Sequence, residues 1–148
     1  MPLLQVNHLK KVYTTRFGGN KVEALRDISF TIEQGEYTAI MGESGSGKTT
    51  LLNLLASVDR PTDGEILLNG KNTVSIKESS LAKFRREHLG FVFQDFNLLD
   101  TFSLEDNIYL PLVLAGKKYD EMAPKLTKIA GQLGIADLLK KYPYEVSG

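Results

Sequence analysis

The eight residues GESGSGKT, Gly42 to Thr49, have the types and spacing needed to hold phosphate groups. They match the pattern G-x-x-x-x-G-K-[ST] at every fixed position. Glycine lets the backbone of such a loop come close to a ligand and adopt a positive φ. Backbone N–H groups of the loop, and those at the start of a following helix, then face the anion. The sequence therefore predicts a loop that binds the phosphates of a nucleotide.

Two side chains of this loop add chemistry to the backbone. Lys48 supplies a cation for the outer phosphates, and Thr49 supplies a hydroxyl ligand for Mg²⁺. The alternative interpretation is a flexible glycine–serine turn, but a match at all the fixed positions is rare by chance. The predicted phosphate-binding residues are Gly42, Glu43, Ser44, Gly45, Ser46, Gly47, Lys48, Thr49 and Thr50.

Strands and one helix are predicted around the loop. Two strands are predicted at Leu3–Tyr13 and Val22–Ile32, on either side of the turn-forming cluster FGGN. The short apolar run Glu36–Met41 predicts a buried strand that leads into the loop. Apolar residues recur at helical spacing over Lys48–Val58, which predicts a helix directly after the loop.

A hairpin, a helix and a further strand are predicted next. Asn69-Gly70 lies between apolar runs in EILLNGKNTV and predicts a type I′ turn. A helix is expected over Ser79–His88. The apolar run Leu89–Phe93 then predicts another buried strand.

The remaining chain has a helical pattern. Ser103 and Asp106 resemble a capping box that starts a helix through Leu114, which Pro111 should kink. A second helix is expected over residues 120–133, with Gly134 at its C-terminal end. A short helix is expected over residues 135–141, ending before a proline.

Composition limits the possible partners. The 148 residues suit one domain, and 18 basic residues balance 18 acidic ones, so there is no global attraction to nucleic acid. There are no cysteines, which excludes disulfides and thiolate metal sites. No apolar run is long enough for a signal peptide or a membrane span. We therefore expect a soluble chain with no nucleic-acid partner and no direct insertion into a membrane.

A phosphate-binding loop alone does not choose among nucleotide-binding classes. A GTPase would need the guanine-reading pattern N-K-x-D after the loop. The Asn20-Lys21 pair lies before the loop and is followed by Val-Glu. A small-molecule kinase usually begins close to its loop, whereas this chain first has a long region of predicted strands.

Four segments together resemble a known family. They are similar, in the same order, to segments of an ABC transporter ATP-binding subunit. The four segments are KVY, ALRDISF, GEYTAIMGESGSGKTTLLNLLASVDRPTDGEI and LGFVFQDFNLL. The resemblance covers the whole chain. It implies an α/β fold, the P-loop NTPase core of an ABC-type ATPase, with an N-terminal antiparallel β subdomain and a helical subdomain. Residues 1–94 would form the β subdomain and P-loop core, and residues 95–148 the Q-loop and helical subdomain.

The resemblance also implies roles for individual residues. Tyr13 matches the aromatic residue that stacks on adenine, the alternative being an ordinary strand tyrosine. Gln94 matches the Q-loop glutamine, which contacts Mg²⁺ and the attacking water, the alternative being a surface glutamine. In the family interpretation, Gln94 and Lys48 would be the catalytic residues. Ser147 and Gly148 match the start of the signature motif, which contacts ATP held by a facing subunit.

Two family motifs have no match in these residues. No run of four apolar residues is followed by Asp-Glu, as a Walker B strand requires, and both histidines precede the signature position. We therefore expect the chain to end inside the signature motif with an incomplete ATPase core. The complete protein would hydrolyse ATP, whereas this chain alone would bind nucleotide without turnover.

The segment from Phe84 to Lys117 is most similar to ATPases of the bacitracin-efflux type. Lipoprotein-release and macrolide-export ATPases are the alternatives. This resemblance implies ATP and Mg²⁺ as cofactors, a separate membrane permease as partner, and a homodimer of ATPase subunits when ATP binds. The protein would be cytoplasmic and peripheral to the inner face of the membrane. Leu104–Ala115 would face the permease, unless its apolar side chains are simply core.

Overall fold

The computed structural model describes residues 2–14 and 19–146. The chain divides into two compact units, Met1–Leu89 and Gly90–Gly148, and each is considered by itself. The predicted subdomain division into residues 1–94 and 95–148 stays a prediction. No helix in the described part of the chain is both long and apolar enough to cross a membrane.

The first unit contains a four-stranded antiparallel sheet with the strand order β2-β1-β3-β4. The opening strands and the later hairpin are therefore confirmed, although the FGGN turn lies partly outside the described residues. Asn69 and Gly70 both have positive φ, as a type I′ turn requires. The strands are β1 (Leu4–Thr14), β2 (Lys21–Ile32), β3 (Asp63–Leu68) and β4 (Lys71–Asn72).

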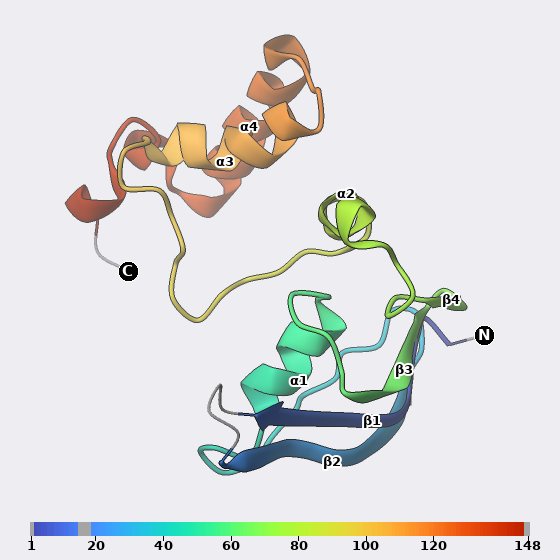
Figure 1. Ribbon diagram of the computed structural model, residues 1–148. Helices are drawn as coiled ribbons and strands as arrows, with labels where there is room; N and C mark the ends of the chain where they lie inside the picture. Colours follow the sequence, from blue (N-terminus) through green and yellow to red (C-terminus); the bar gives the residue numbers. More distant parts are fainter. Residues whose placement is uncertain (1, 15–18, 147–148) are drawn as a thin grey trace. The chain divides into compact units, whose positions relative to one another are not determined.

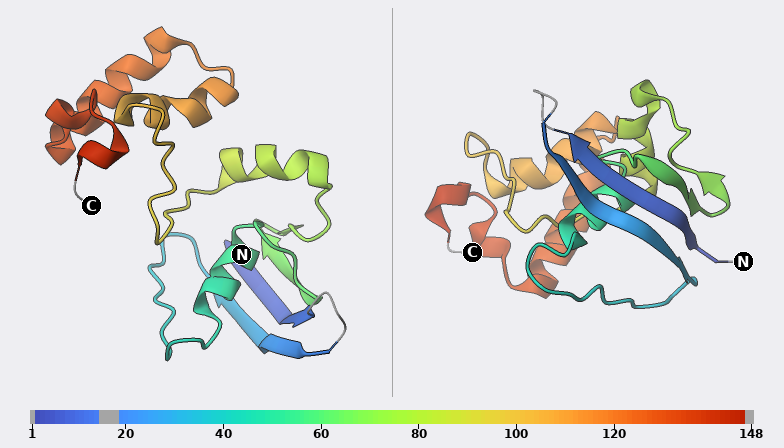
Figure 2. Two further views of the ribbon diagram at one scale, coloured as in Figure 1. Left: turned by 60° about the vertical axis from the view of Figure 1, so that its left-hand side comes forward. Right: turned by 60° about the horizontal axis from the view of Figure 1, so that its bottom comes forward.

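Helix α1 (Lys48–Leu55) lies against one face of this sheet (Figures 1 and 2). Leu51 and Leu54 point from the helix into the core, because they recur at the spacing of one helix face. The helix ends before the predicted Val58, since Ser57 has a left-handed φ of 54°. The buried core of the unit consists of Val6, Leu9, Leu25, Leu51, Leu54 and Ile66. Helix α2 (Glu78–His88) follows β4 and agrees with its predicted position.

Two predicted strands are wrong. Residues 36–41 and 89–93 form no strand, and Tyr37 and Val92 are each 97% exposed where buried side chains were expected. Figure 1 shows the first of these segments as a loop running from β2 to α1. A strand exists only through ladder hydrogen bonds to a neighbouring strand. Neither segment has such a neighbour within the described residues.

The second unit is helical, with α3 (Leu104–Leu114) and α4 (Tyr119–Leu133) side by side in Figures 1 and 2. The predicted cap is confirmed, because Ser103 Oγ accepts a hydrogen bond from the Asp106 N–H at 3.1 Å. Gly134 ends α4 with a φ of 69°, as predicted. Pro111 lies inside α3, and its kink stays a prediction. The core consists of Tyr109, Met122, Leu126 and Ala130.

The chain ends in short helical turns. The helix predicted over residues 135–141 is wrong in extent, because only the 3₁₀ turn η1 (Ala136–Leu138) forms there. A second 3₁₀ turn, η2 (Pro143–Glu145), follows it. The Glu145 side chain accepts a hydrogen bond from the Tyr142 N–H at 2.7 Å and so helps to fix this turn.

Candidate nucleotide-binding site

The phosphate-binding loop requires glycine at two positions. Gly45 and Gly47 have φ values of 78° and 91°, which side-chain-bearing residues rarely adopt. At Gly47 a Cβ atom would also lie 2.6 Å from the carbonyl oxygen of Ala24 on β2. The Ser46 N–H donates to the Glu43 carbonyl oxygen at 3.2 Å and closes a turn inside the loop. The loop is therefore tightly curved and lies directly against the sheet.

Helix α1 begins immediately after this curve. Gly47 is its N-cap and supplies no side-chain hydrogen bond, and its first turn contains no acidic residue. The first N–H groups of a helix have no acceptor within the helix. They also form the positive end of the helix dipole. The start of α1, including Lys48, Thr49 and Thr50, can therefore bind an anion.

The Lys48 ammonium group is folded onto the loop that precedes it. Its Nζ donates to the carbonyl oxygens of Gly42 at 2.8 Å and Glu43 at 2.6 Å. The Ser46 hydroxyl oxygen is a third acceptor, at 3.3 Å. These bonds hold the cation at the loop. Phosphate oxygens are stronger, charged acceptors for the same donor.

Tyr13 lies at the end of the sheet that meets this loop. It pairs with Val22 on β2, and Ala24 on the same strand touches Gly47. Two residues along a strand span about 7 Å, and adjacent strands lie about 5 Å apart. The Tyr13 side chain is 42% exposed, so part of it is open to a ligand. The structure thus places Tyr13 on the strand next to the one that Gly47 approaches, and the predicted adenine contact stays a prediction.

The donor set of the loop is compatible with Mg²⁺. Mg²⁺ usually takes few protein ligands and completes its shell with substrate phosphates and water. Thr49 provides a hydroxyl at the second position of α1. No group of three or more His, Cys, Asp or Glu side chains suited to a metal occurs in the described ranges. Thr49 is therefore the loop residue that would contact a nucleotide-bound Mg²⁺.

The other predicted site residues are not joined to this loop by any described contact. Gln94 is exposed in the irregular segment of the second unit that precedes α3. Its contacts with Mg²⁺ and water stay predictions. Ser147 and Gly148 lie outside the described residues, so their role toward a facing subunit also stays a prediction.

Sequence reasoning did not single out the groups that hold Tyr13. The Tyr13 hydroxyl donates to Asp59 at 2.9 Å, and Lys11 contacts the same carboxylate at 2.8 Å. Asp59 is distant in the sequence, so no local pattern links it to the tyrosine. Lys11 could have been noticed, because residues two apart on a strand share a face.

Comparisons with known proteins agree with this geometry. The family model described as "ABC transporter" matches residues 25–148. The "ABC transporter ATP-binding protein YxdL" of Bacillus subtilis (strain 168) is 53% identical over 146 residues, covering 99% of this chain and 56% of the relative. The "Bacitracin export ATP-binding protein BceA" of Halalkalibacterium halodurans is 44% identical over 148 residues, covering 100% of this chain and 58% of the relative.

A solved structure gives the same fold. The chain superposes on the dimeric structure of MJ0796, a bacterial ABC transporter cassette, with a TM-score of 0.89 and 30% sequence identity. The match covers 98% of this chain and 63% of the cassette. The chain thus spans between half and two thirds of these relatives. The predicted α/β ABC-type ATPase fold is confirmed, and the chain belongs to the ABC transporter family, among its ATP-binding proteins.

Proposed function

We propose that the protein containing this chain hydrolyses ATP to drive export or detoxification of an antimicrobial peptide through a separate membrane permease. The observation that carries the ATP-binding part is the loop Gly42–Thr49, with Lys48 held over it and α1 starting behind it. Each of these parts favours the same bound group, a polyphosphate.

The loop would bind the nucleotide through three kinds of group. Backbone N–H groups of the loop and of the first turn of α1 hold the phosphates. Lys48 moves its donors from the carbonyl oxygens of Gly42 and Glu43 to the outer phosphates. Thr49 would help to hold Mg²⁺ at the phosphates, where the ion would supply positive charge for phosphoryl transfer. Gln94 would orient the attacking water and contact the metal.

The proposed partners follow from the family. Two copies would pack so that Ser147 and Gly148 of one copy reach the ATP of the other, and the solved relative is described as a dimer. A membrane permease would dock on the helical unit, where Leu104–Ala115 carries exposed apolar side chains, among them Val113 and Leu114. The protein would thus work at the cytoplasmic face of the membrane.

The peptide substrate is supported by sequence similarity alone. The relative BceA is described as a bacitracin export protein and matches the full length of this chain. On this relative, and on the resemblance of residues 84–117 to the bacitracin-efflux type, we favour a bacitracin-like peptide over a macrolide or a lipoprotein.

Resistance conferred by the complete gene tests this proposal. Lys48→Ala should abolish growth under bacitracin, because the outer phosphates lose their cation. Lys128→Ala removes an exposed lysine of α4 and is the matched control, which should keep resistance. Immunoblotting must detect both proteins at the wild-type level. Unchanged bacitracin resistance in the Lys48→Ala strain would refute the proposed function, as would resistance to macrolides in place of bacitracin.

A further inference from the structure

The Tyr13 side chain is held by Lys11 and Asp59, two residues to which the family resemblance assigned no role. Its hydroxyl donates to Asp59 Oδ2 at 2.9 Å. The Lys11 ammonium donates to Asp59 Oδ1 at 2.8 Å and to the Arg60 carbonyl oxygen at 2.6 Å. The same ammonium lies 4.8 Å from the centre of the Tyr13 ring. A cation at this distance is attracted to the aromatic ring. Tyr13 is therefore held both through its hydroxyl and through its ring.

This network differs from an ordinary surface ion pair. The Lys11 and Asp59 side chains are only 12% and 32% exposed, respectively. Burial raises the pKa of the Asp59 carboxyl, but hydrogen bonds from Lys11, the Arg60 N–H and Tyr13 together lower that pKa below its ordinary value. Asp59 is therefore charged at neutral pH, and a charged acceptor makes a stronger hydrogen bond to the tyrosine.

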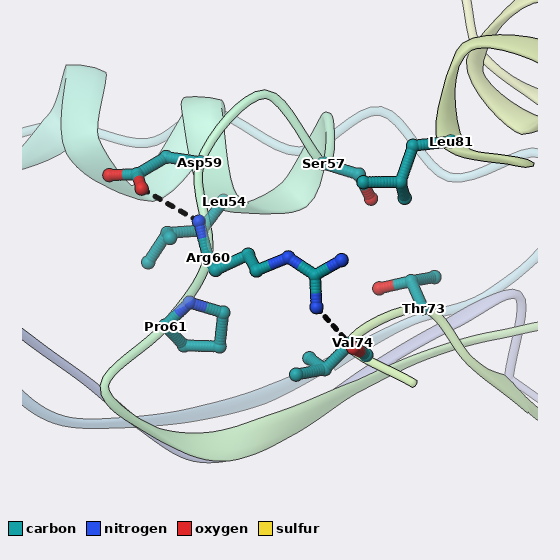
Figure 3. A pocket seen from close by; sticks show the side chains of 8 residues that line it. All are labelled: Leu54, Ser57, Asp59, Arg60, Pro61, Thr73, Val74 and Leu81. Carbon is teal, nitrogen blue, oxygen red and sulfur yellow. Dashed lines mark hydrogen bonds between the residues drawn. The ribbon is translucent and has the colours of Figure 1, made fainter. Parts of the chain in front are cut away.

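The turn that carries Asp59 is itself anchored. Figure 3 shows the Asp59 carboxylate bonded to the Arg60 N–H while the Arg60 side chain extends the other way, to the Val74 carbonyl oxygen. Arg60 also donates to Ile76 O at 3.1 Å. On the strand side, Thr62 exchanges hydrogen bonds with β1, since its N–H donates to Lys10 O and its hydroxyl accepts from the Val12 N–H. The carboxylate thus has a fixed place beside β1.

A fixed tyrosine matters because of where it lies. Tyr13 is near the end of β1, at the side of the sheet that touches the phosphate-binding loop. A half-exposed side chain near a strand end otherwise moves among rotamers, and a ligand that stacks on it must first order it. An anchor that orders the ring in advance removes this entropy loss from binding.

We propose that Asp59, acting with Lys11, is a positioning residue for the nucleotide base: it holds the Tyr13 ring ready for stacking and does not itself touch the nucleotide. The inference rests on the proposed nucleotide-binding function and extends it to two residues outside the phosphate-binding loop. The two halves of the ligand would be bound by different residues. Asp59 and Lys11, the anchor, act on the base through Tyr13, and the loop acts on the phosphates.

Binding of two probes to the complete protein tests this separation. The probes are ATP and inorganic tripolyphosphate, each with Mg²⁺, measured by calorimetry. Asp59→Ala should weaken ATP binding about threefold to tenfold, the effect of losing one hydrogen bond. Tripolyphosphate has no base, so its affinity should be unchanged. Asp27→Ala is the matched control, since Asp27 pairs with His8 of β1 at 3.1 Å and is not part of the anchor.

A second variant keeps the anchor pair intact. Tyr13→Phe removes only the hydroxyl and leaves Asp59 bonded to Lys11, so it should fold even if Asp59→Ala does not. It should weaken ATP binding in the same direction and leave tripolyphosphate binding unchanged. In a Tyr13→Ala background, which has no ring to position, Asp59→Ala should have no further effect on ATP affinity.

The outcomes distinguish the two proposals. If the wild type binds neither probe, the proposed nucleotide-binding function is wrong. If the wild type binds both probes and Tyr13→Phe keeps full ATP affinity, only the positioning role is wrong. Two further results would overturn the positioning role, because each indicates a merely structural role for Asp59. One is an equal loss of affinity for both probes in Asp59→Ala. The other is an undiminished loss of ATP affinity when Asp59→Ala is made in the Tyr13→Ala background.

Discussion

At the scale of single residues, the site depends on backbone geometry as much as on side chains. Gly47 connects the phosphate-binding loop to α1 and at the same time touches β2 at Ala24 and Leu25. Lys48 is the next residue, and the carbonyl oxygens of Gly42 and Glu43 hold its ammonium group at the loop. The sequence pattern GESGSGKT predicts the glycines, whereas the contact with β2 appears only in the folded chain.

Two glycines of the loop allow a matched comparison. Gly47→Ala places a side chain at a φ of 91°, which is strained for alanine, and its Cβ atom would lie 2.6 Å from the Ala24 carbonyl oxygen. Gly45→Ala places a side chain at a φ of 78°, but its Cβ atom would have no neighbouring atom within 4 Å. Gly45→Ala should lower the free energy of unfolding by about 1 kcal/mol, and Gly47→Ala should lower it by about 3 kcal/mol. Urea denaturation measures both. Equal losses would show that contact with β2 does not restrict this position.

At the scale of the elements, local signals correctly located several turns and helix ends that are stabilised by neighbouring residues. Asn69-Gly70 predicted the β3–β4 turn, and Ser103 and Gly134 predicted helix ends, because each acts on its own neighbours in the chain. The apolar runs at residues 36–41 and 89–93 misled the prediction. Their composition suits a strand, but strand formation depends on a distant neighbour that a local pattern does not specify.

The same distinction applies to the site. The loop Gly42–Thr49 is continuous in sequence, so its residues could be picked out from a local pattern, and their contacts with phosphate stay a prediction. The anchor of Tyr13 could not be picked out in this way, because Lys11 and Asp59 meet only when β1 and the turn after α1 come together. Gln94 was predicted from a resemblance, and the segment that carries it has no ladder partner among the described residues.

One side chain organises the loop before α3. Asn107 donates to the carbonyl oxygens of Leu99, Phe102 and Ser103, and its own oxygen accepts from the Leu99 N–H at 2.8 Å. Asn107→Ala should therefore raise the hydrogen-exchange rate of the Leu99 amide about tenfold, as expected when one hydrogen bond is lost.

Thr127→Ala is the control for this exchange measurement. Thr127 lies on α4, and its hydroxyl bonds only to the Ala123 carbonyl oxygen of the same helix among the contacts described. The Leu99 amide should exchange at the wild-type rate in this variant. If the Asn107→Ala protein also shows the wild-type rate, the side chain does not hold the loop.

At the scale of the whole molecule, the two units carry different parts of the proposed cycle. The first holds the phosphate-binding loop and the anchored Tyr13, and the second holds Gln94 and the helices proposed to meet the permease. Apolar side chains such as Tyr37, Met41 and Val92 are almost fully exposed. Exposed apolar surface promotes association. Functional measurements therefore belong in the complete protein.

The central claim is that the loop Gly42–Thr49 binds ATP through Lys48, and the dissociation constant for Mg²⁺–ATP tests it most directly. Calorimetry on the complete protein should show at least about tenfold weaker binding for Lys48→Ala, because charged hydrogen bonds to phosphate are lost. Lys128→Ala should bind like the wild type. Equal dissociation constants for the wild type and Lys48→Ala would contradict the claim.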